Sequence, residues 1–398
     1  MIPRGRIDIS ISEISRGISY CLADLLGVAT PLDNKNEHQL ICLSVRTGFD
    51  LLLTALDLPP GSEIIVSSIS IPDMFSIVEA HQLVAVPVGV DKRTLNTSEE
   101  EIRNVLSTKT KAILITHLFG AVADIEGVIA LATEHNLLVI EDGAQAYAGD
   151  NYKGHSKSDV IMLSFGMIKT NTAIQGAVIV FNNASLSNRV IQLHSQLPKQ
   201  ATPVYLKKLV KAFFIRLMTN RWLYTLFYFL IRIQKKDIDQ VLSGFTRGFP
   251  GKDILSKIRY GANDPLKRLL ACKLDHYNAV KIEKRKLYAI NILSNIPRRM
   301  TVGFQNLKNS YWVLPVETEQ PEALIAYVRK KGFDVTSKAS SLINLTYTDK
   351  TSPDHLNLEK LVYLPMYPKM SYKKQLELIN HLNQFQMQQE QELITSSF

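Results

Sequence analysis

Asp142 and Lys169 are the two residues of this sequence whose types and placement point most directly to chemistry. Asp142 ends the apolar run LLVIED, and Lys169 follows a second apolar run in the small polar loop MIKTNT. Enzymes that use pyridoxal phosphate (PLP) need a lysine amine for a Schiff base and a carboxylate that keeps the pyridine nitrogen protonated. The two residues therefore have the layout of a PLP site, in which the cofactor ring withdraws electrons.

The segments around both residues resemble the DegT/DnrJ/EryC1/StrS family of fold-type I PLP enzymes, most of which are sugar aminotransferases. LLVIEDGAQA resembles the family motif V-I-E-D-x-A-Q-A, and SFGMIK resembles S-F-x-x-x-K. Four more stretches resemble family signatures that occur in the same order: LDLPPGSEIIV, VPVGVDKRTL, HLFG and LPMYP. The signatures extend from about Cys42 to the C-terminus, so the resemblance covers most of the chain.

The resemblance implies a role for each matching residue. Lys169 is expected to be the Schiff-base lysine, with a pKa lowered by burial and nearby cations. Asp142 is expected to pair with the pyridinium nitrogen, whereas alternation along the strand points Glu141 to the other face. Gln145 is expected to hydrogen-bond the 3-oxygen of the ring, and Ser164 to bind the phosphate. Each residue also has an ordinary structural interpretation. Lys169 could be a surface lysine of a loop and Asp142 a helix cap. Gln145 could be an ordinary helix residue, and Ser164 a serine that bonds its own backbone at a strand end.

The expected phosphate loop departs from the family pattern. The family shows S-G-T-x-A-L, and this chain shows SVRTGF, with Arg46 where the threonine usually stands and Thr47 after it. Backbone N–H groups at a helix start bind anions, and an arginine binds phosphate through two hydrogen bonds. We expect Arg46 and Thr47 to bind the cofactor, with Arg46 contacting either its phosphate or an acidic substrate.

Other departures place the chain in a divergent branch of the family. The aromatic residue that commonly covers the PLP ring aligns with Ile71, and the glycine-rich stretch after the lysine is reduced to AIQGA. The asparagine that a neighbouring subunit often contributes aligns with Lys257, while Arg259 is retained. His117 is either a structural histidine or a residue of the cleft. No cluster of cysteines and histidines has metal-ligand spacing, so no metal is expected.

The expected fold is α/β, with a mostly parallel sheet of the PLP fold-type I kind. Short apolar runs alternate with helical stretches such as Ile125–His135, which is typical of such sheets. Asp142 and Ser164 fall at carboxyl ends of strands, where these sheets bind ligands. The strands are expected at Ile64–Val66, Val84–Val88, Ala112–Thr116, Leu137–Glu141, Val160–Leu163 and Ala177–Phe181.

Length and composition predict two domains in a cytoplasmic protein. A chain of 398 residues exceeds one ordinary core, and we expect a large PLP-binding domain at 1–274 and a small α+β domain at 275–398. The small domain is expected to hold helices at Pro321–Lys331 and Tyr372–Gln386, followed by a frayed tail. Three scattered cysteines indicate a reducing compartment, and the N-terminus lacks the apolar segment of a signal peptide.

The net charge of +9 is concentrated in one segment. No Asp or Glu occurs between Val160 and Lys236, and residues 204–236 combine eight cations with many aromatic residues. The uncharged run between Arg221 and Arg232 is too short to cross a membrane. Two interpretations stay open: amphipathic helices that lie on a membrane surface, or a helical insertion packed on the domain or on a partner subunit. No nucleic-acid-binding motif accompanies the charge.

The expected activity is the amination of a keto-sugar, most plausibly nucleotide-linked, with glutamate as the amino donor. Lys169 would carry the proton between donor and cofactor, and the family resemblance implies a homodimer. Two alternatives stay open. One is another PLP reaction such as sugar dehydration, although family members that dehydrate tend to carry histidine where this chain has Lys169. The other is a non-catalytic relative held at a membrane through 204–236.

Overall fold

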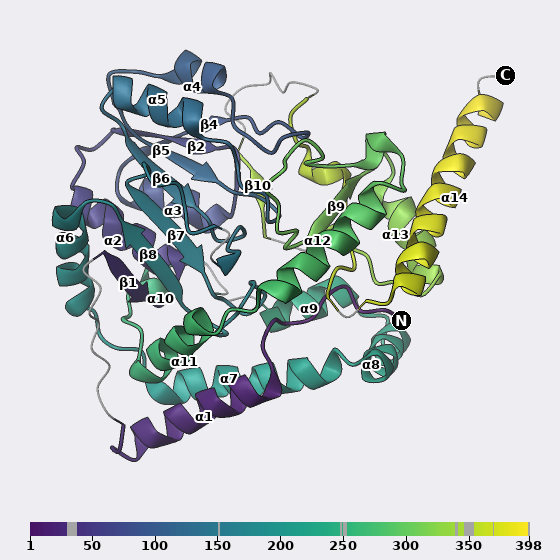
Figure 1. The fold of residues 1–398 in the computed structure, drawn as a ribbon, viewed down its shortest axis with the longest axis horizontal. Helices are drawn as coiled ribbons and strands as arrows, with labels where there is room; N and C mark the ends of the chain where they lie inside the picture. Colours follow the sequence, from purple (N-terminus) through teal and green to yellow (C-terminus); the bar gives the residue numbers. More distant parts are fainter. Residues whose placement is uncertain are drawn as a thin grey trace.

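A computed structural model of the chain provides the fold. It describes residues 1–29, 38–149, 152–246, 249, 253–338, 341–345, 354–368 and 370–396, with side chains up to residue 392. A central sheet with helices on both faces forms one part, and helices around a small sheet form the other (Figure 1). The predicted α/β fold with a mostly parallel sheet is confirmed.

The central sheet has seven strands, and its order places the predicted site residues at one edge. From one side to the other the strands are β1 (Gln39–Cys42), β8 (Ala177–Phe181), β7 (Val160–Ser164), β6 (Leu138–Asp142), β5 (Thr110–Thr116), β2 (Glu63–Ser67) and β4 (Val84–Val88). The strands from β7 to β4 are parallel, whereas β8 is antiparallel to both of its neighbours. Because β6 and β7 are parallel neighbours, their carboxyl ends lie side by side.

Helices cover both faces of this sheet because its strands are apolar on both sides. One face packs against α2 (Val45–Leu56), α3 (Pro72–Ala80), α6 (Ala184–Ser195) and α10 (Leu255–Ile258). The other face packs against α4 (Glu99–Val105) and α5 (Glu126–Glu134), and beside them against α1 (Ile11–Leu25), α7 (Thr202–Met218) and α11 (Asp264–Asp275). The sheet is therefore the middle layer of three.

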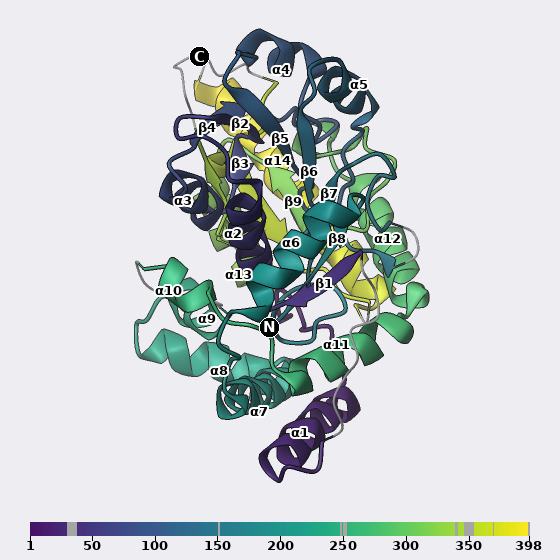
Figure 2. The same cartoon turned by 90° about the vertical axis from the view of Figure 1, so that its left-hand side faces the viewer.

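Helices α1 and α7 lie side by side below the sheet (Figures 1 and 2). Ser10 and Glu13 form a capping box that starts α1. Leu209 of α7 packs into a common core with Ile14, and the absence of a side chain at Gly17 lets Leu209 approach the α1 backbone. This packing fixes α7, the first helix of the predicted insertion, against the large half of the molecule.

The C-terminal half has its own core around β9 (Leu314–Glu317) and β11 (Leu361–Leu364), which pair antiparallel. Helices α12 (Ala279–Leu293), α13 (Pro321–Lys330) and α14 (Tyr372–Ser396) surround this pair. A short strand, β10 (Ile343–Asn344), pairs with β3 (Ile69–Ser70) of the other half. Ile2 forms a bridge with Phe333, so the first residues also pack on the C-terminal half. A division at residue 274 stays a prediction.

Several local expectations need correction. The leucine spacing of Leu40–Leu58 predicts a helix-rich segment, but the segment begins within β1, because QLIC is too short to show a pattern before the Ser44 helix cap. The sequence also predicts a strand around Val335, where the structure has single bridges instead. The tail expected to fray is helical through Ser396, since its Gln, Glu and Leu residues favour the helix that begins at Tyr372.

Candidate active site

The carboxyl ends of β6 and β7 open into a cavity of about 1000 Å³. The predicted residues Asp142, Gln145, Ser164, Lys169 and Arg46 all line this cavity. They come from β6, the turn after it, β7, the loop after β7 and the first turn of α2. The structure thus brings together five of the six residues that were predicted from the sequence.

Lys169 lies in the loop after β7 with its ammonium 4.0 Å from the centre of the Trp312 ring. Its pKa is lowered to about 8, because burial disfavours the charged amine and the nearby Arg46 adds like-charge repulsion, while Asp142 opposes both effects. A lysine with this pKa is partly neutral at neutral pH and can act as a nucleophile or a base.

Asp142 is buried at the end of β6, where its Oδ1 accepts a hydrogen bond from the Ala144 N–H at 3.0 Å. Burial raises the pKa of this carboxyl, although Lys169 and the Ala144 N–H oppose the shift. A buried carboxylate gains stability from a cationic partner. Asp142 therefore suits a ligand that presents a protonated ring nitrogen.

Glu141 and His117 form a separate buried pair on the other side of the strand. His117 Nδ1 accepts from the Ala123 N–H at 3.0 Å, and its Nε2 lies 2.7 Å from a Glu141 oxygen. Burial would raise the pKa of Glu141, but the hydrogen bond and charge of His117, together with the hydroxyl groups of Ser158 and Tyr152, outweigh it and lower the pKa to about 2. Neither residue lines the cavity. The structural interpretation of His117 is therefore the one that the geometry supports.

Gln145 and Ser164 present polar groups to the cavity. The Oε1 atom of Gln145 accepts from the Phe119 N–H at 2.8 Å, which leaves the amide N–H groups to donate to a ligand. An anionic ring oxygen needs such a donor. Ser164, at the end of β7, is only partly buried, and its hydroxyl lies 3.5 Å from the Gly166 N–H.

Arg46 and Thr47 differ in where they point. Arg46 lines the cavity, where it is paired with Asp73. The Thr47 hydroxyl is buried and donates to the Ile258 carbonyl at 2.9 Å, so the structure does not bring the Thr47 side chain to the cavity. Ser44 caps α2 by accepting from the Thr47 N–H. The cofactor contact predicted for Thr47 stays a prediction, and its side chain does not supply it in this geometry.

The positions that depart from the family pattern have distinct surroundings. Ile71 lines the cavity, as an apolar cover for a ring requires. In the AIQGA stretch, Ile174 keeps a left-handed backbone (φ +72°), although that conformation costs a non-glycine residue about 1–2 kcal/mol. Lys257 does not line the cavity, and Arg259 donates two hydrogen bonds to Asp50 at 2.9 and 3.0 Å.

Two cavity residues, Trp312 and Arg285, were not found from the sequence. Trp312 donates from its indole N–H to the Ile168 carbonyl at 2.8 Å, which sets the ring beside Lys169. Arg285 of α12 donates to the Ser310 carbonyl at 2.7 Å and to the Thr170 hydroxyl at 3.2 Å. Both join the loop after β7 to the C-terminal half. An aromatic or basic residue more than a hundred positions away gives no local signal.

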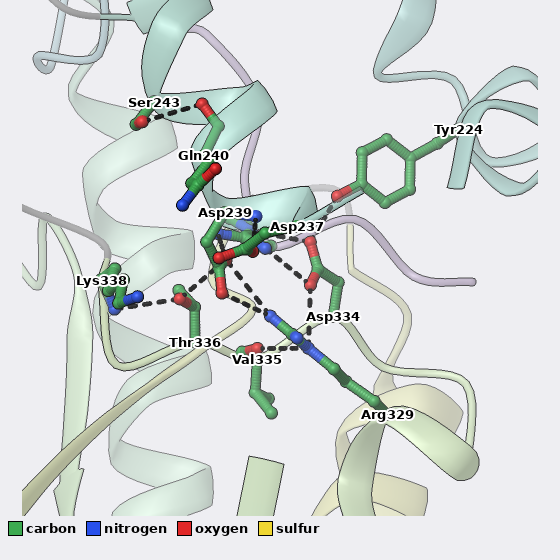
Figure 3. Close-up of polar contacts among 11 residues, drawn as sticks. Tyr224, Asp237, Asp239, Gln240, Ser243, Arg329, Asp334, Val335, Thr336 and Lys338 are labelled. Carbon is green, nitrogen blue, oxygen red and sulfur yellow. Dashed lines mark hydrogen bonds and ion pairs between the residues drawn. The ribbon is translucent and has the colours of Figure 1, made fainter. Parts of the chain in front are cut away.

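A buried ionic network holds the other wall of the cavity (Figure 3). Arg4 contacts Asp334 through two hydrogen bonds of 2.7 and 2.9 Å and pairs with Asp239 at 2.6 Å. Arg329 also pairs with Asp239, at 3.1 Å, and the Tyr224 hydroxyl donates to Asp334. The network thus ties the N-terminus, α8 (Arg221–Ile233) and α9 (Ile238–Thr246) to the C-terminal half.

Comparison with known proteins shows what the segment around this site is similar to. The sequence profile of the DegT/DnrJ/EryC1/StrS aminotransferase family matches residues 34–217, which include β6, β7 and Lys169. Over this stretch the chain is similar to that family. GDP-perosamine synthase of Caulobacter vibrioides is 32% identical over 192 residues, which make up 47% of this chain and 49% of that protein. The matched region thus spans about half the length of this curated relative.

Solved aminotransferases share the fold along nearly the whole chain. NtdA of Bacillus subtilis, crystallised with bound PMP, matches with a TM-score of 0.66 and 17% identity over 94% of this chain and 82% of that one. The aminotransferase of Psychrobacter cryohalolentis matches with a TM-score of 0.66 and 19% identity over 96% and 98%. The sugar aminotransferase CalS13 of Micromonospora echinospora matches with a TM-score of 0.65 and 15% identity over 96% and 100%. The predicted fold-type I architecture is confirmed.

Proposed function

We propose that the protein is a PLP-dependent aminotransferase that aminates a keto-sugar, nucleotide-linked, with glutamate as the amino donor. One observation carries the proposal: a lysine of lowered pKa and a buried carboxylate lie at the ends of neighbouring strands and face one cavity. The family match over residues 34–217 supports it. The sugar and the nucleotide are suggested by the relatives' names.

The side chains of the cavity fit PLP at each of its polar groups. Asp142 is a buried carboxylate suited to the pyridinium nitrogen, and the amide N–H groups of Gln145 suit the 3-oxygen. Ser164, Arg46 and the start of α2 supply donors and positive charge for the phosphate. When bound, PLP withdraws electrons from the carbon that carries the amino group.

The protein's own groups then move protons and exclude water. Lys169 is placed to take a proton and return it, because its pKa of about 8 is near the working pH. Asp142 holds the proton on the ring nitrogen throughout. Ile71 and Trp312 bring apolar surface to the cavity and reduce the access of water.

The absorption spectrum of purified protein loaded with PLP tests the proposal. We expect a visible band from the lysine-bound cofactor, its bleaching by glutamate with release of 2-oxoglutarate, and no such band in Lys169→Ala. A wild-type protein without the band would favour the non-catalytic alternative. A band that glutamate leaves unchanged would point to another donor or to another PLP reaction.

We further propose a cytoplasmic homodimer that contacts membranes peripherally. The dimer rests on the family resemblance alone and is tested by light scattering on the eluting protein. None of the helices in the described residues is long and apolar enough to cross a bilayer. Helices α7 and α8, however, expose large apolar side chains, notably Phe214, Trp222, Leu226, Phe229 and Ile233.

Charge favours an anionic lipid surface as the neighbour of this exposed face. Arg221, Arg232, Lys235 and Lys236 flank the apolar side chains and are themselves exposed. A second copy seated there would bring like charges together, whereas anionic headgroups attract them. Sedimentation with phosphatidylserine vesicles tests this contact. We expect Trp222→Ala to weaken binding roughly tenfold and Leu287→Ala, an exposed change on α12, to leave it unchanged.

A further inference from the structure

Helix α7 lines the cavity with a stripe of side chains that the proposed chemistry does not use. Lys208, Lys211, Ile215 and Thr219 recur every three or four positions, and all line the cavity. Lys207, next to the first of them, lies instead on the exposed side of the helix. The helix therefore directs two specific ammonium groups inward.

These two lysines crowd positive charge in a partly buried place. Burial and the neighbouring Lys211 lower the pKa of Lys208 to about 8. No carboxylate among the described residues contributes to this shift or forms an ion pair with either lysine. Two cations that face each other without a counter-charge are unfavourable unless an anion joins them.

Gln175 completes the group with an unused donor. Its Oε1 accepts a hydrogen bond from the Lys208 ammonium. Its amide nitrogen is buried and has no hydrogen-bond partner among the described residues, although the residue is only 5% exposed and lines the cavity. A buried donor of this kind normally has an acceptor. Two ammonium groups and an amide N–H therefore call for a ligand that is anionic and rich in acceptor oxygens.

The balance of charge along the whole cavity points the same way. Ten cationic side chains line it, against four carboxylates. Three of those carboxylates are already paired with cavity cations, since Asp8 binds Lys281, Asp73 binds Arg46 and Asp239 binds Arg4. The positive charge at Lys208 and Lys211 is thus left for a ligand rather than for the protein itself.

The lysine pair of α7 adjoins the β6 and β7 end of the cavity but has different charged neighbours. The pKa of Lys169 responds to Asp142 and Arg46, and that of Lys208 responds to Lys211. The ring of Phe249 lies 5.5 Å from the Arg46 guanidinium and 5.8 Å from the Lys208 ammonium, and so it adjoins both ends. A cavity of about 1000 Å³ is at the upper end of the range for one small ligand.

We propose that Lys208, Lys211 and Gln175 form a second anion subsite, which binds the diphosphate of the acceptor substrate. This assignment rests on the proposed function, because only an aminotransferase with an anionic acceptor needs such a subsite beside Lys169. The assignment also explains the role of the insertion. Helix α7 packs against α1 on one side and presents Lys208 and Lys211 to the cavity on another.

The phosphate of PLP has the same chemistry and is the competing source of the anion. The two sources differ in one respect that can be measured. A diphosphate subsite stays available after PLP has bound, whereas a cofactor-phosphate site is filled by PLP. Binding is therefore measured by calorimetry on the PLP-loaded protein in phosphate-free buffer, with inorganic pyrophosphate as the probe.

We expect pyrophosphate to bind the loaded wild-type protein, and Lys208→Met or Lys211→Met to weaken that binding roughly tenfold or more. Lys207→Met, one position away on the exposed side of α7, is the matched control and is expected to change the affinity less than twofold. All three variants are expected to keep wild-type PLP affinity and helix content, because methionine is a good helix former.

Three results would overturn the subsite. Pyrophosphate could fail to bind the loaded wild-type protein, could bind Lys208→Met and Lys211→Met as tightly as wild type, or could bind only protein without PLP while Lys208→Met loses affinity for PLP. The last result would assign the lysines to the cofactor phosphate. Failure of the proposed function is distinguishable, because it shows as a wild-type protein without the cofactor band, whatever its affinity for pyrophosphate.

Discussion

Lys169 and Lys208 face the same cavity, and in each the pKa is lowered to about 8, yet their surroundings differ. Lys169 follows a strand, lies against Trp312 and has Asp142 as a nearby opposite charge. Lys208 lies on a helix, donates to Gln175 and has Lys211 as its charged neighbour. Burial alone therefore does not assign a function to a lysine, and the neighbouring charges decide it.

The difference between the two lysines has a physical consequence. A carboxylate beside Lys169 can hold a cationic ring in place while the amine is released as a base. A second cation beside Lys208 attracts an anion and offers nothing to a cationic ring. The β6 and β7 end of the cavity is thus suited to covalent chemistry, and the α7 end to binding.

The largest expected difference is between variants that lack the amine of one lysine or of the other. We expect Lys169→Ala to lose the cofactor band and to lower aminotransferase activity by about 10³-fold or more, because a general acid–base group contributes on that order. Lys208→Met should keep the band. Steady-state kinetics and absorption spectra check both, and equal losses in the two variants would contradict the division of roles.

Asp142→Asn should have the next largest effect. The substitution removes the charge that holds the ring nitrogen protonated, and we expect activity to fall by about 10²-fold. PLP should still bind, since Ser164, Arg46 and Gln145 are unchanged. Activity within twofold of wild type in a protein that retains PLP would rule out this role for Asp142.

Glu141→Gln is the matched control for that change, because the neighbouring carboxylate serves stability. Loss of the charged partner of His117 should lower the free energy of unfolding by about 2 kcal/mol while activity stays near wild type. The pKa of Glu141 lies below its ordinary 4.5, at about 2. The ionised Glu141 therefore stabilises the fold fully above pH 4.5, and this contribution is lost as the pH falls toward 2. Thermal melts at different pH should show this loss in wild type and not in Glu141→Gln.

The smallest expected effect is a shift in the pH at which the protein captures PLP. This midpoint responds separately to each charged neighbour of Lys169. Capture needs the neutral amine of Lys169, so its rate should rise with pH through about 8 and then level off. Asp142→Asn should move this midpoint to lower pH, because Asp142 raises the pKa of Lys169. Arg46→Gln should move it to higher pH, and Lys208→Met should leave it in place. A midpoint near the ordinary 10.5 would contradict the buried position of Lys169.

The residues at the β6 and β7 end of the cavity were predictable from the sequence because their signals are local. Asp142 and Ser164 end apolar strands, and parallel neighbours bring such ends together. The succession of strands and helices along the chain followed from the same alternation. The antiparallel direction of β8 was not predicted, because an apolar run has the same pattern in either direction.

The remainder of the cavity was not predictable from local patterns. Trp312, Arg285 and Lys208 reach it from elements more than thirty positions from Lys169, and no spacing rule connects them. Thr47 follows a helix cap and was assigned to the site, but its hydroxyl satisfies the Ile258 carbonyl, a contact that only tertiary packing creates. The charge of 204–236 was visible in the sequence, although the split between its inward and outward lysines was not.

The most direct test of the account is to find which lysine carries PLP. Reduction of the PLP-loaded wild-type protein with borohydride fixes the bond between cofactor and lysine, and mass spectrometry of its peptides locates it. The account predicts one modified lysine, Lys169, with Lys208 unmodified despite its similar pKa. Modification of Lys208 instead of Lys169, or of neither, would contradict the assignment on which the proposed function depends.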